Sequence, residues 1–330
     1  MKTLLSSTLS LLVVAISFTA EAASGPPPPS VNEPAGINLG STSFYDGFTG
    51  PTGLSHLVYL RYDQASSFRD SNGHENKQFD NPKISVATLL NQFSYYSPQE
   101  IWKGAHLGWN LIVPIVSLDG DFGDAGPKLK DNGVGLGDIV AGPQMVFDPL
   151  VDEHGRPVLA NRIALDVILP TGKYDKHRDL NQGSNFYSFN PYWASTWLPA
   201  PRWELSWRLY YLYNFKNRDP ASSSIQVFEG GPVRDTQAGQ AAWANFSASY
   251  EVIPNLSVGI SGYYFKQLDE DQVNGQRLAD SREKVLGIGP GLFWRISTAE
   301  GFWFNTYREV SAENRNQNDF SVQVRFAHAF

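Results

Sequence analysis

Apolar and polar residues alternate along much of this chain, most clearly from Arg202 to Tyr213. One set of alternate positions is entirely apolar or aromatic: Trp203, Leu205, Trp207, Leu209, Tyr211 and Tyr213. The opposite set begins with Arg202, Glu204, Ser206 and Arg208. A repeat of two over this length predicts a β-strand with one apolar face, close to the roughly 9–11 residues that a tilted strand needs to cross a membrane.

The same alternation recurs along the chain, for example over 106–115, 162–169, 242–250 and 255–264. We predict an all-β fold, an up-and-down antiparallel transmembrane barrel of about twelve strands. Fourteen strands are the alternative if the segment 36–53 contributes. The predicted strands are 54–64, 84–97, 105–116, 135–147, 158–170, 185–198, 202–214, 238–251, 255–267, 283–295, 301–310 and 319–330.

The gaps between these strands alternate in length. The long gaps are 65–83, 117–134, 171–184, 215–237, 268–282 and 311–318, and the short ones are 98–104, 148–157, 199–201, 252–254 and 296–300. Outer-membrane barrels have long extracellular loops and short periplasmic turns. The alternation therefore favours such a barrel over a soluble sandwich, and an even number of strands places both ends of the chain in the periplasm.

The first residues have the pattern of an export signal. Lys2 precedes an apolar run from Leu4 to Ala20, and Ala20-Glu21-Ala22 is a small-x-small cleavage motif. We expect 1–22 to be a cleaved signal peptide, with an uncleaved anchor as the alternative, and the mature protein to reside in the bacterial outer membrane. The segment 23–53 is rich in proline, glycine and serine, and is expected to be a lead-in or a small plug before the barrel at 54–330.

Composition narrows the choice of class. Aromatic residues make up 13% of the chain and charged residues 18%, against about 25% charged in soluble domains. Mean hydropathy is −0.30, and after the first residues no apolar run is long enough for a membrane helix. The net charge of −7 argues against a nucleic-acid partner. The chain has no cysteine, which is compatible with the oxidising periplasm.

The last strand carries an assembly signal. Phe320, Val322, Val324, Phe326 and Phe330 share one face, and Phe330 is the last residue. A final amphipathic strand that ends in phenylalanine resembles the signal read by the barrel-assembly machinery, although His328 interrupts the apolar row. We assign this assembly signal to Phe326 and Phe330. We expect the folded barrel to contact outer-membrane lipid and lipopolysaccharide.

Function should lie in the lumen, toward which the polar faces of the strands point. The inward positions are Asn110, Asp138, Arg162, Asp166, Glu204, Arg208, Tyr210, Trp243, Asn245, Asn305, Gln323 and Arg325. A barrel of about twelve strands is wider than the eight-stranded barrels that side chains just fill, so these residues can line a pore. The alternative is that they pair with each other inside a plugged barrel, because buried charges must be paired.

No pattern indicates an enzyme, a metal site or a cofactor. The acidic run from Asp119 to Asp124 begins like a calcium loop, but Lys130 stands where that loop needs a glutamate. His74 has Ser71 and Asn72 beside it in a predicted loop, and this is the strongest hint of a hydrolase. We predict no catalytic residue, no metal and no cofactor.

Four short motifs resemble a known family. They are Gly135-Leu136-Gly137-Asp138, Leu169-Pro170-Thr171-Gly172-Lys173-Tyr174-Asp175, Asn190-Pro191 and Gly287-Ile288-Gly289-Pro290-Gly291, in this order. Together they resemble the MetA-pathway of phenol degradation family of outer-membrane proteins over about 45–330. The resemblance implies a barrel that admits small hydrophobic or aromatic compounds, and it implies no catalytic residues.

The sequence therefore predicts a passive outer-membrane channel for small hydrophobic or aromatic solutes. A barrel hydrolase and a structural barrel with a closed lumen are the alternatives.

Overall fold

The structure is a computed structural model that describes residues 31, 34, 36–77, 82–123, 126 and 128–330. The predicted signal peptide and the residues 23–30 that follow it lie outside the described part. The described residues form no helix long and apolar enough to cross a membrane.

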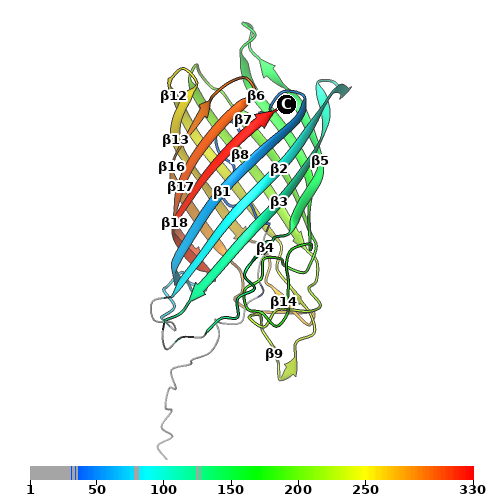
Figure 1. Ribbon diagram of the computed structural model, residues 1–330, viewed down its shortest axis with the longest axis vertical. Helices are drawn as coiled ribbons and strands as arrows, with labels where there is room; N and C mark the ends of the chain where they lie inside the picture. Colours follow the sequence, from blue (N-terminus) through cyan, green and yellow to red (C-terminus); the bar gives the residue numbers. More distant parts are fainter. Residues whose placement is uncertain (1–30, 32–33, 35, 78–81, 124–125, 127) are drawn as a thin grey trace, which may run out of the picture.

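Twelve antiparallel strands close into a barrel, as predicted (Figure 1). The first half consists of β1 (Gly53–Phe68), β2 (Lys83–Trp102), β3 (Ala105–Asp121), β5 (Ile139–Val151), β6 (Pro157–Leu169) and β7 (Ser188–Trp197). The second half consists of β8 (Trp203–Asn214), β12 (Ala241–Ile253), β13 (Leu256–Gln267), β16 (Lys284–Arg295), β17 (Glu300–Glu313) and β18 (Asn316–Ala329). Each strand pairs with its neighbour in the chain, and β1 pairs with β18 from Ser55 opposite Ala329 to Phe68 opposite Asn316. This last pairing removes the open edges that a sheet in lipid cannot have.

Several short strands lie outside the barrel wall proper. A thirteenth strand of the main sheet, β4 (Val134–Leu136), pairs with β3 just before β5 continues along the same neighbour. The others lie in the loops: β9 (Val227–Phe228), β10 (Gly231–Pro232), β11 (Thr236–Gln237), β14 (Gln272–Val273) and β15 (Gln276–Arg277). The segment 36–53 adds no strand of its own, so the count is twelve rather than fourteen.

The two faces of the wall follow the predicted alternation. In β8, Glu204, Ser206 and Arg208 are buried, whereas Trp203 and Leu209 are exposed on the outside. Exposed tryptophans gather near one end of the barrel, among them Trp102, Trp197, Trp203 and Trp294. Exposed Tyr62, Tyr187, Tyr213 and Phe215 lie near the other end. Two aromatic girdles around an apolar band are the outer surface that lipid requires.

The barrel has two different ends. At the end called here the short-turn end, neighbouring strands are joined by brief turns such as 103–104 and 254–255. At the long-loop end, β6 is joined to β7 by 170–187 and β8 to β12 by 215–240. The predicted loop 311–318 is the exception, because β17 and β18 are joined by residues 314–315 alone. Asn314 has a φ of 55°, which such a tight turn requires. The sequence around this turn is polar, so it does not show the apolar alternation of a strand. Both β17 and β18 nevertheless continue beyond the apolar band.

The described residues test the predicted position of the C-terminus, whereas the N-terminus lies outside them. Strand β1 starts at the short-turn end and Phe330 ends there, with its N–H bonded to the Leu54 carbonyl (Figure 1). The residues before β1, however, run back through the lumen. Val31 consequently packs against Ala238 and Val273 among the long loops. An even number of strands puts the start of β1 and the end of β18 at the same end of the barrel. It does not determine where the segment before β1 lies.

The outward position of Leu209 gives a test of the register. Its side chain is 43% exposed, and it lies opposite Trp193 and Ala244 in the neighbouring strands. We expect Leu209→Arg to lower the free energy of unfolding in lipid by roughly 2–4 kcal/mol, because a charge would face hydrocarbon. Leu209→Phe should be close to neutral, and urea titration in vesicles measures both. Equal stability of the two variants would contradict the assigned register.

Candidate functional site: the lumen and its plug segment

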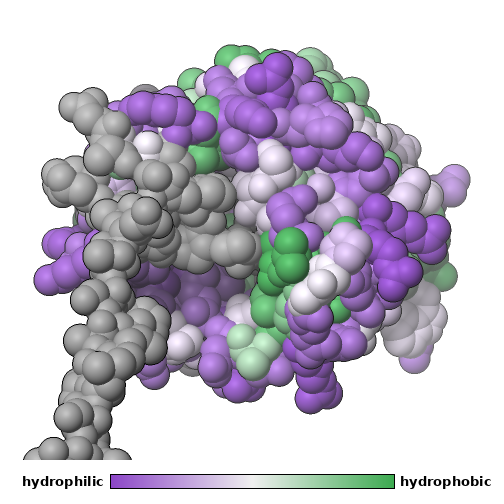
Figure 2. Space-filling model, turned by 90° about the horizontal axis from the view of Figure 1, so that it is seen from below, coloured by the Kyte–Doolittle hydropathy of each residue, from purple (hydrophilic) through white to green (hydrophobic). Residues whose placement is uncertain are grey.

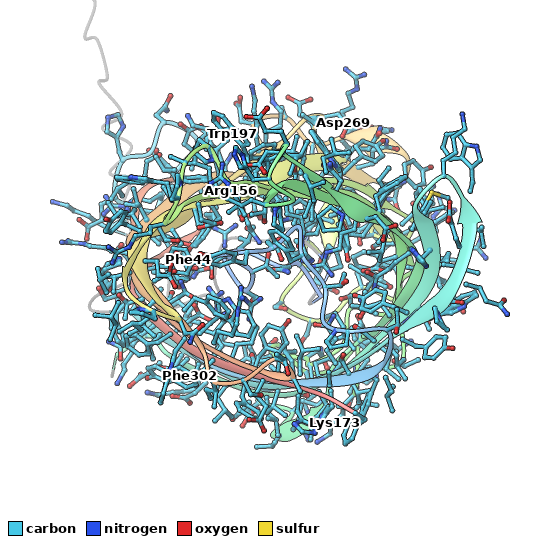
Figure 3. All side chains as sticks on the ribbon, turned by 90° about the horizontal axis from the view of Figure 1, so that it is seen from above. Phe44, Arg156, Lys173, Trp197, Asp269 and Phe302 are labelled. Carbon is cyan, nitrogen blue, oxygen red and sulfur yellow. The ribbon has the colours of Figure 1, made fainter. Side chains whose placement is uncertain are left out.

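The lumen is occupied by a piece of the chain itself, residues 36–49, called here the plug segment. Ser41, Thr42, Ser43 and Phe44 are buried, and Phe44 is completely inaccessible. Figure 3 looks into the short-turn end and shows Phe44 inside the ring of strands, with the chain around it crossing the lumen. The plug segment has no regular secondary structure, so its backbone polar groups need partners from the barrel wall.

Wall side chains supply those partners along the first part of the plug segment. Asn245 accepts from the Gly40 N–H at 3.0 Å and donates to the Asn38 carbonyl at 3.2 Å. The Trp243 indole donates to the same Asn38 carbonyl at 2.9 Å. Further donors reach the Leu39, Gly40 and Ser41 carbonyls from Arg61, Tyr307 and Gln323 respectively. Side chains of the wall therefore make the hydrogen bonds to this backbone that a neighbouring strand would make in a sheet.

The second part of the plug segment is held by charge. The Asp46 carboxylate accepts bonds from Arg208 Nε at 2.7 Å and Nη2 at 2.5 Å, and from Arg162 Nη2 at 3.1 Å. All three side chains are nearly inaccessible to solvent. Arg162 Nε also donates to the Asp46 carbonyl at 3.0 Å. Charge-assisted bonds in a buried setting are about twice as strong as neutral ones, so Asp46 is the main anchor of the plug segment.

Backbone N–H groups on either side of this anchor are also paired. The Tyr45 N–H donates to Glu204 Oε1 at 3.0 Å, and the Gly47 N–H donates to Thr196 Oγ1 at 2.8 Å. Gly47 runs so close to β6 and β7 that a Cβ there would lie 2.3 Å from the Thr196 nitrogen and 2.5 Å from the Ala160 oxygen. Only glycine fits this approach.

Aromatic rings and apolar side chains fill the lumen toward the long-loop end. The Tyr210 and Trp243 rings stack 4.4 Å apart, Tyr192 lies 5.3 Å from Tyr210, and Phe265 lies 5.9 Å from Trp243. Ile37 and Leu39 of the plug segment pack against this cluster. Stacked and tilted rings at these distances attract each other beyond the effect of buried area. This half of the lumen is a packed core.

All twelve predicted lumen residues are buried. Seven of them bond to the plug segment: Arg162, Glu204, Arg208, Trp243, Asn245, Asn305 and Gln323. Asn110 and Asp166 bond to each other at 3.4 Å. Asp138 stands apart, because its carboxylate accepts from the Gly172 and Ser184 N–H groups and fixes a long loop. Tyr210 belongs to the aromatic cluster, and Arg325 faces the remaining space.

That space is a cavity of about 690 Å³ at the short-turn end, where the plug segment no longer fills the barrel. Its walls combine aromatic residues, among them Tyr45, Tyr59, Phe293 and Trp303, with arginines including Arg325. The volume lies within the usual range of small-molecule sites, roughly 300–1,000 Å³. The lumen therefore has a packed half and an open half, divided by the Asp46 anchor.

No pattern in the sequence points to Asp46, the residue on which this arrangement depends. It is the only acidic residue between 34 and 62, and it lies in a segment with no strand pattern. A usable signal was the set of three inward arginines, Arg162, Arg208 and Arg325. Each buried cation needs a carboxylate close to it, and Asp46 in the lead-in is a further carboxylate within reach of the barrel.

Loops cover the long-loop end, and Figure 2 shows a mostly hydrophilic surface there. Beneath it, Val31, Ala238 and Val273 form a small apolar cluster with Phe228 and Leu278 around them. The Asp271 carboxylate lies next to this cluster and accepts from the Gly239 N–H at 2.9 Å and from Gln267 Nε2 at 2.6 Å. This apolar cluster together with Asp271 is called here the loop cap. It ties Val31, which precedes the plug segment, to the loops after β8 and β13.

The hydrolase hint finds no support in the arrangement of histidines. The His74 side chain is 81% exposed and lies 3.8 Å from Asp70, and within the described ranges no histidine ring bonds a serine hydroxyl. Among the same residues, no three histidine or acidic side chains are grouped as a metal site would need.

Comparison with known proteins decides the family. A family model described as Putative MetA-pathway of phenol degradation matches residues 65–326. The chain belongs to this family.

The COG4313 outer membrane channel from Pseudomonas putida F1 has a similar structure, with a TM-score of 0.71 and 19% identity over 89% of this chain and 100% of that chain. A Pseudomonas aeruginosa FadL homologue matches with a TM-score of 0.42 and 9% identity over 91% of this chain and 99% of that chain. The NanC porin also matches, with a TM-score of 0.42 and 9% identity over 83% of this chain and 100% of that chain. No curated protein matches the chain. At 19% identity, the likeness to the first of these channels establishes the fold of an outer-membrane channel.

The motifs of this phenol-degradation family member have structural roles. Asp138 of the first motif bonds the backbone of Gly172 in the second. In the last motif, a Cβ on Gly287 would lie 2.3 Å from the Tyr263 ring, and one on Gly291 would lie 3.0 Å from the Phe44 ring. These glycines make room for inward aromatic side chains and for the plug segment. They do not form a phosphate-binding loop.

Asp46→Asn should loosen the plug segment while the barrel stays intact. The variant leaves Arg162 and Arg208 without a buried counter-charge, and breaking such a pair costs about 3–5 kcal/mol. We expect ion conductance in planar bilayers to rise several-fold. The control is Asp166→Asn, which removes another lumen carboxylate that is not bonded to the plug segment. Unchanged conductance in Asp46→Asn, or an equal rise in both variants, would contradict the anchoring role.

The loop cap should loosen at alkaline pH. Burial raises the pKa of Asp271 to about 7, from 3.8 in the open chain. The Asp271 carboxyl therefore binds its proton more tightly in the closed cap than in the unfolded chain. Protonation of Asp271 stabilises the closed cap fully below about pH 4, and this stabilisation is lost as the pH rises through about 7. We expect amide exchange in 268–280, corrected for its intrinsic pH dependence, to increase between pH 6 and pH 8. Asp271→Asn should abolish this increase, and a persistent increase would assign it to another group.

Proposed function

We propose that this protein is an outer-membrane channel for the passive uptake of small hydrophobic or aromatic compounds, opened by displacement of the plug segment. The proposal is supported most directly by the way the lumen is filled. Through the middle of the lumen, the wall residues hold a segment of the same chain by hydrogen bonds and ion pairs, and the rings of the packed half lie against that segment. A segment held by such bonds can move aside, and its departure would leave the rings of the packed half without part of their packing.

The distribution of aromatic residues supports the solute class. Inward rings occur in both halves of the lumen. Tyr210 and Trp243 lie on the long-loop side of the Asp46 anchor, and Phe293 and Trp303 lie on its short-turn side. A flat apolar solute that replaces the plug segment would therefore meet ring faces along its path. Membership of the phenol-degradation family points to the same class of compounds.

The ends of the barrel give the direction of the path. By the rule for outer-membrane barrels, the long loops face outward and the short turns face the periplasm. The packed half of the lumen and the loop cap then face the outside, and the cavity of about 690 Å³ opens toward the periplasm. The solute would enter where the cap lies and leave through the cavity. The plug segment separates the two.

A barrel with a permanently closed lumen is the rival that the same contacts favour, because the described residues satisfy most polar groups of the plug segment. It predicts that the plug segment never moves and that no solute passes. A reversible lock on the plug segment separates these two functions.

A disulfide between the plug segment and the wall provides that lock. Ser43 Oγ donates to Asn305 Oδ1 at 3.1 Å, and the chain has no cysteine of its own. We expect oxidised Ser43→Cys/Asn305→Cys protein to show no ion current and no swelling of liposomes in a small permeant sugar. A reductant should restore both, and aromatic alcohols should compete with the restored flux.

The single-cysteine variants are the controls and should not respond to the reductant. A reduced double variant that stays as closed as the oxidised one would support the permanently closed barrel.

A further inference from the structure

The cavity at the short-turn end carries an excess of positive charge. Six arginines line it, against three carboxylates, those of Asp46, Glu251 and Glu300. Most of the arginines are engaged or solvated. Arg162 and Arg208 bind Asp46, Arg156 binds Asp152, and Arg202 donates to two carbonyl groups of β12. Arg295 is exposed at the rim.

Arg325 differs from all of these. Its side chain is 4% exposed and faces the cavity from β18. Within the described part of the chain it has no carboxylate partner in an ion pair, and its Nε has no hydrogen-bond partner. Both Asp46 oxygens are already bonded by Arg162 and Arg208. The groups that favour its charge are the Tyr59 side chain and, without a direct bond, the Asp46 carboxylate. A buried charge with no carboxylate in contact is costly, so an anion in the cavity would stabilise this position.

The walls around Arg325 indicate the shape of that anion. The guanidinium carbon lies 3.8 Å from the Trp303 ring centre and 5.7 Å from that of Tyr59. The Phe293 ring is 4.6 Å from Trp303 and 5.0 Å from Tyr45, so an aromatic wall continues from the arginine. A guanidinium binds a carboxylate through two parallel N–H bonds, and the adjacent rings can stack on a flat apolar group.

We propose that the cavity binds a small aromatic carboxylate, with its carboxylate on Arg325 and its ring against Trp303 and Phe293. This inference rests on the proposed function, because it names the solute class that the channel would hold on its periplasmic side. Arg325 then acts as a binding residue that favours aromatic acids over neutral aromatic compounds. The ring of the ligand lies against side chains, and only its charged end requires the arginine.

Binding to the refolded protein tests this. Titration calorimetry would compare benzoate with benzyl alcohol, which keeps the ring and loses the charge, and with cyclohexanecarboxylate, which keeps the charge and loses the flat ring. We expect saturable binding of benzoate, at least about tenfold weaker binding of each of the other two, and loss of benzoate binding in Arg325→Gln, because the charge-assisted bonds are removed.

The matched control is Arg295→Gln, which also removes one positive charge at the cavity mouth, but from an exposed side chain with no ion pair in the described structure. It should bind benzoate within about twofold of the parent protein, since exposed charges are screened. Arg325→Lys keeps the charge without the planar fork and should retain intermediate affinity. Equal affinity for benzoate and benzyl alcohol, or equal losses in Arg325→Gln and Arg295→Gln, would overturn the proposal.

The same preparations separate this proposal from the channel function. Ion current and liposome swelling without Arg325-dependent binding of benzoate would contradict the aromatic-acid site and support the channel function. Arg325-dependent binding of benzoate in a protein that passes no current would support the aromatic-acid site and contradict the channel function. If Arg325→Gln does not fold, the comparison of the three ligands on the parent protein and on Arg325→Lys decides the matter.

Discussion

A single carboxylate between two guanidinium groups determines how the interior of this barrel is organised. Asp46 lies in a segment without regular secondary structure, and Arg162 and Arg208 reach it from β6 and β8. Buried ion pairs add little net stability, because desolvation offsets much of their attraction. Their stronger effect is on position. With Asp46 at any other depth, two arginines and one aspartate would be buried without partners, so the plug segment has one register in the lumen.

That register explains the division of the lumen. Upstream of Asp46, the chain offers carbonyl groups and small residues to Asn245, Trp243 and Gln323, and the larger rings of the wall close around it. Downstream of Asp46, Phe48 to Pro51 line the cavity at the short-turn end, and the chain then enters β1 at Gly53. The cavity is the part of the lumen that this stretch leaves unfilled. A twelve-stranded wall cannot fill such a volume with its own side chains, so the space stays open toward the short turns.

The repeat of two residues made the wall predictable and left the plug segment unpredictable. Strands such as β8 carry their orientation in the sequence, because lipid and lumen demand opposite residues at adjacent positions. The same rule predicts the inward positions, from Asn110 on β3 to Arg325 on β18, and these residues are buried. The plug segment obeys no repeat, because each of its groups is matched to one wall residue, as Gly47 is to the backbone of β7. Such pairings depend on long-range geometry, and a local pattern does not contain them. The tight turn after β17 was missed for a related reason, since strands that extend beyond the lipid lose their apolar face.

The bonding of the plug segment also limits how a channel of this kind can open. Each neutral hydrogen bond contributes about 0.5–1.5 kcal/mol, and many of those that hold the plug segment are neutral, so thermal motion can break them a few at a time. The Asp46 pairs oppose complete release. A solute can shift this balance only if it binds the displaced state better than the closed one. An aromatic ring gains ring contacts once Phe44 leaves its place between the walls, whereas a small polar solute gains little. The selectivity of such a channel would then follow from the energy needed to displace the plug segment rather than from the width of a pore.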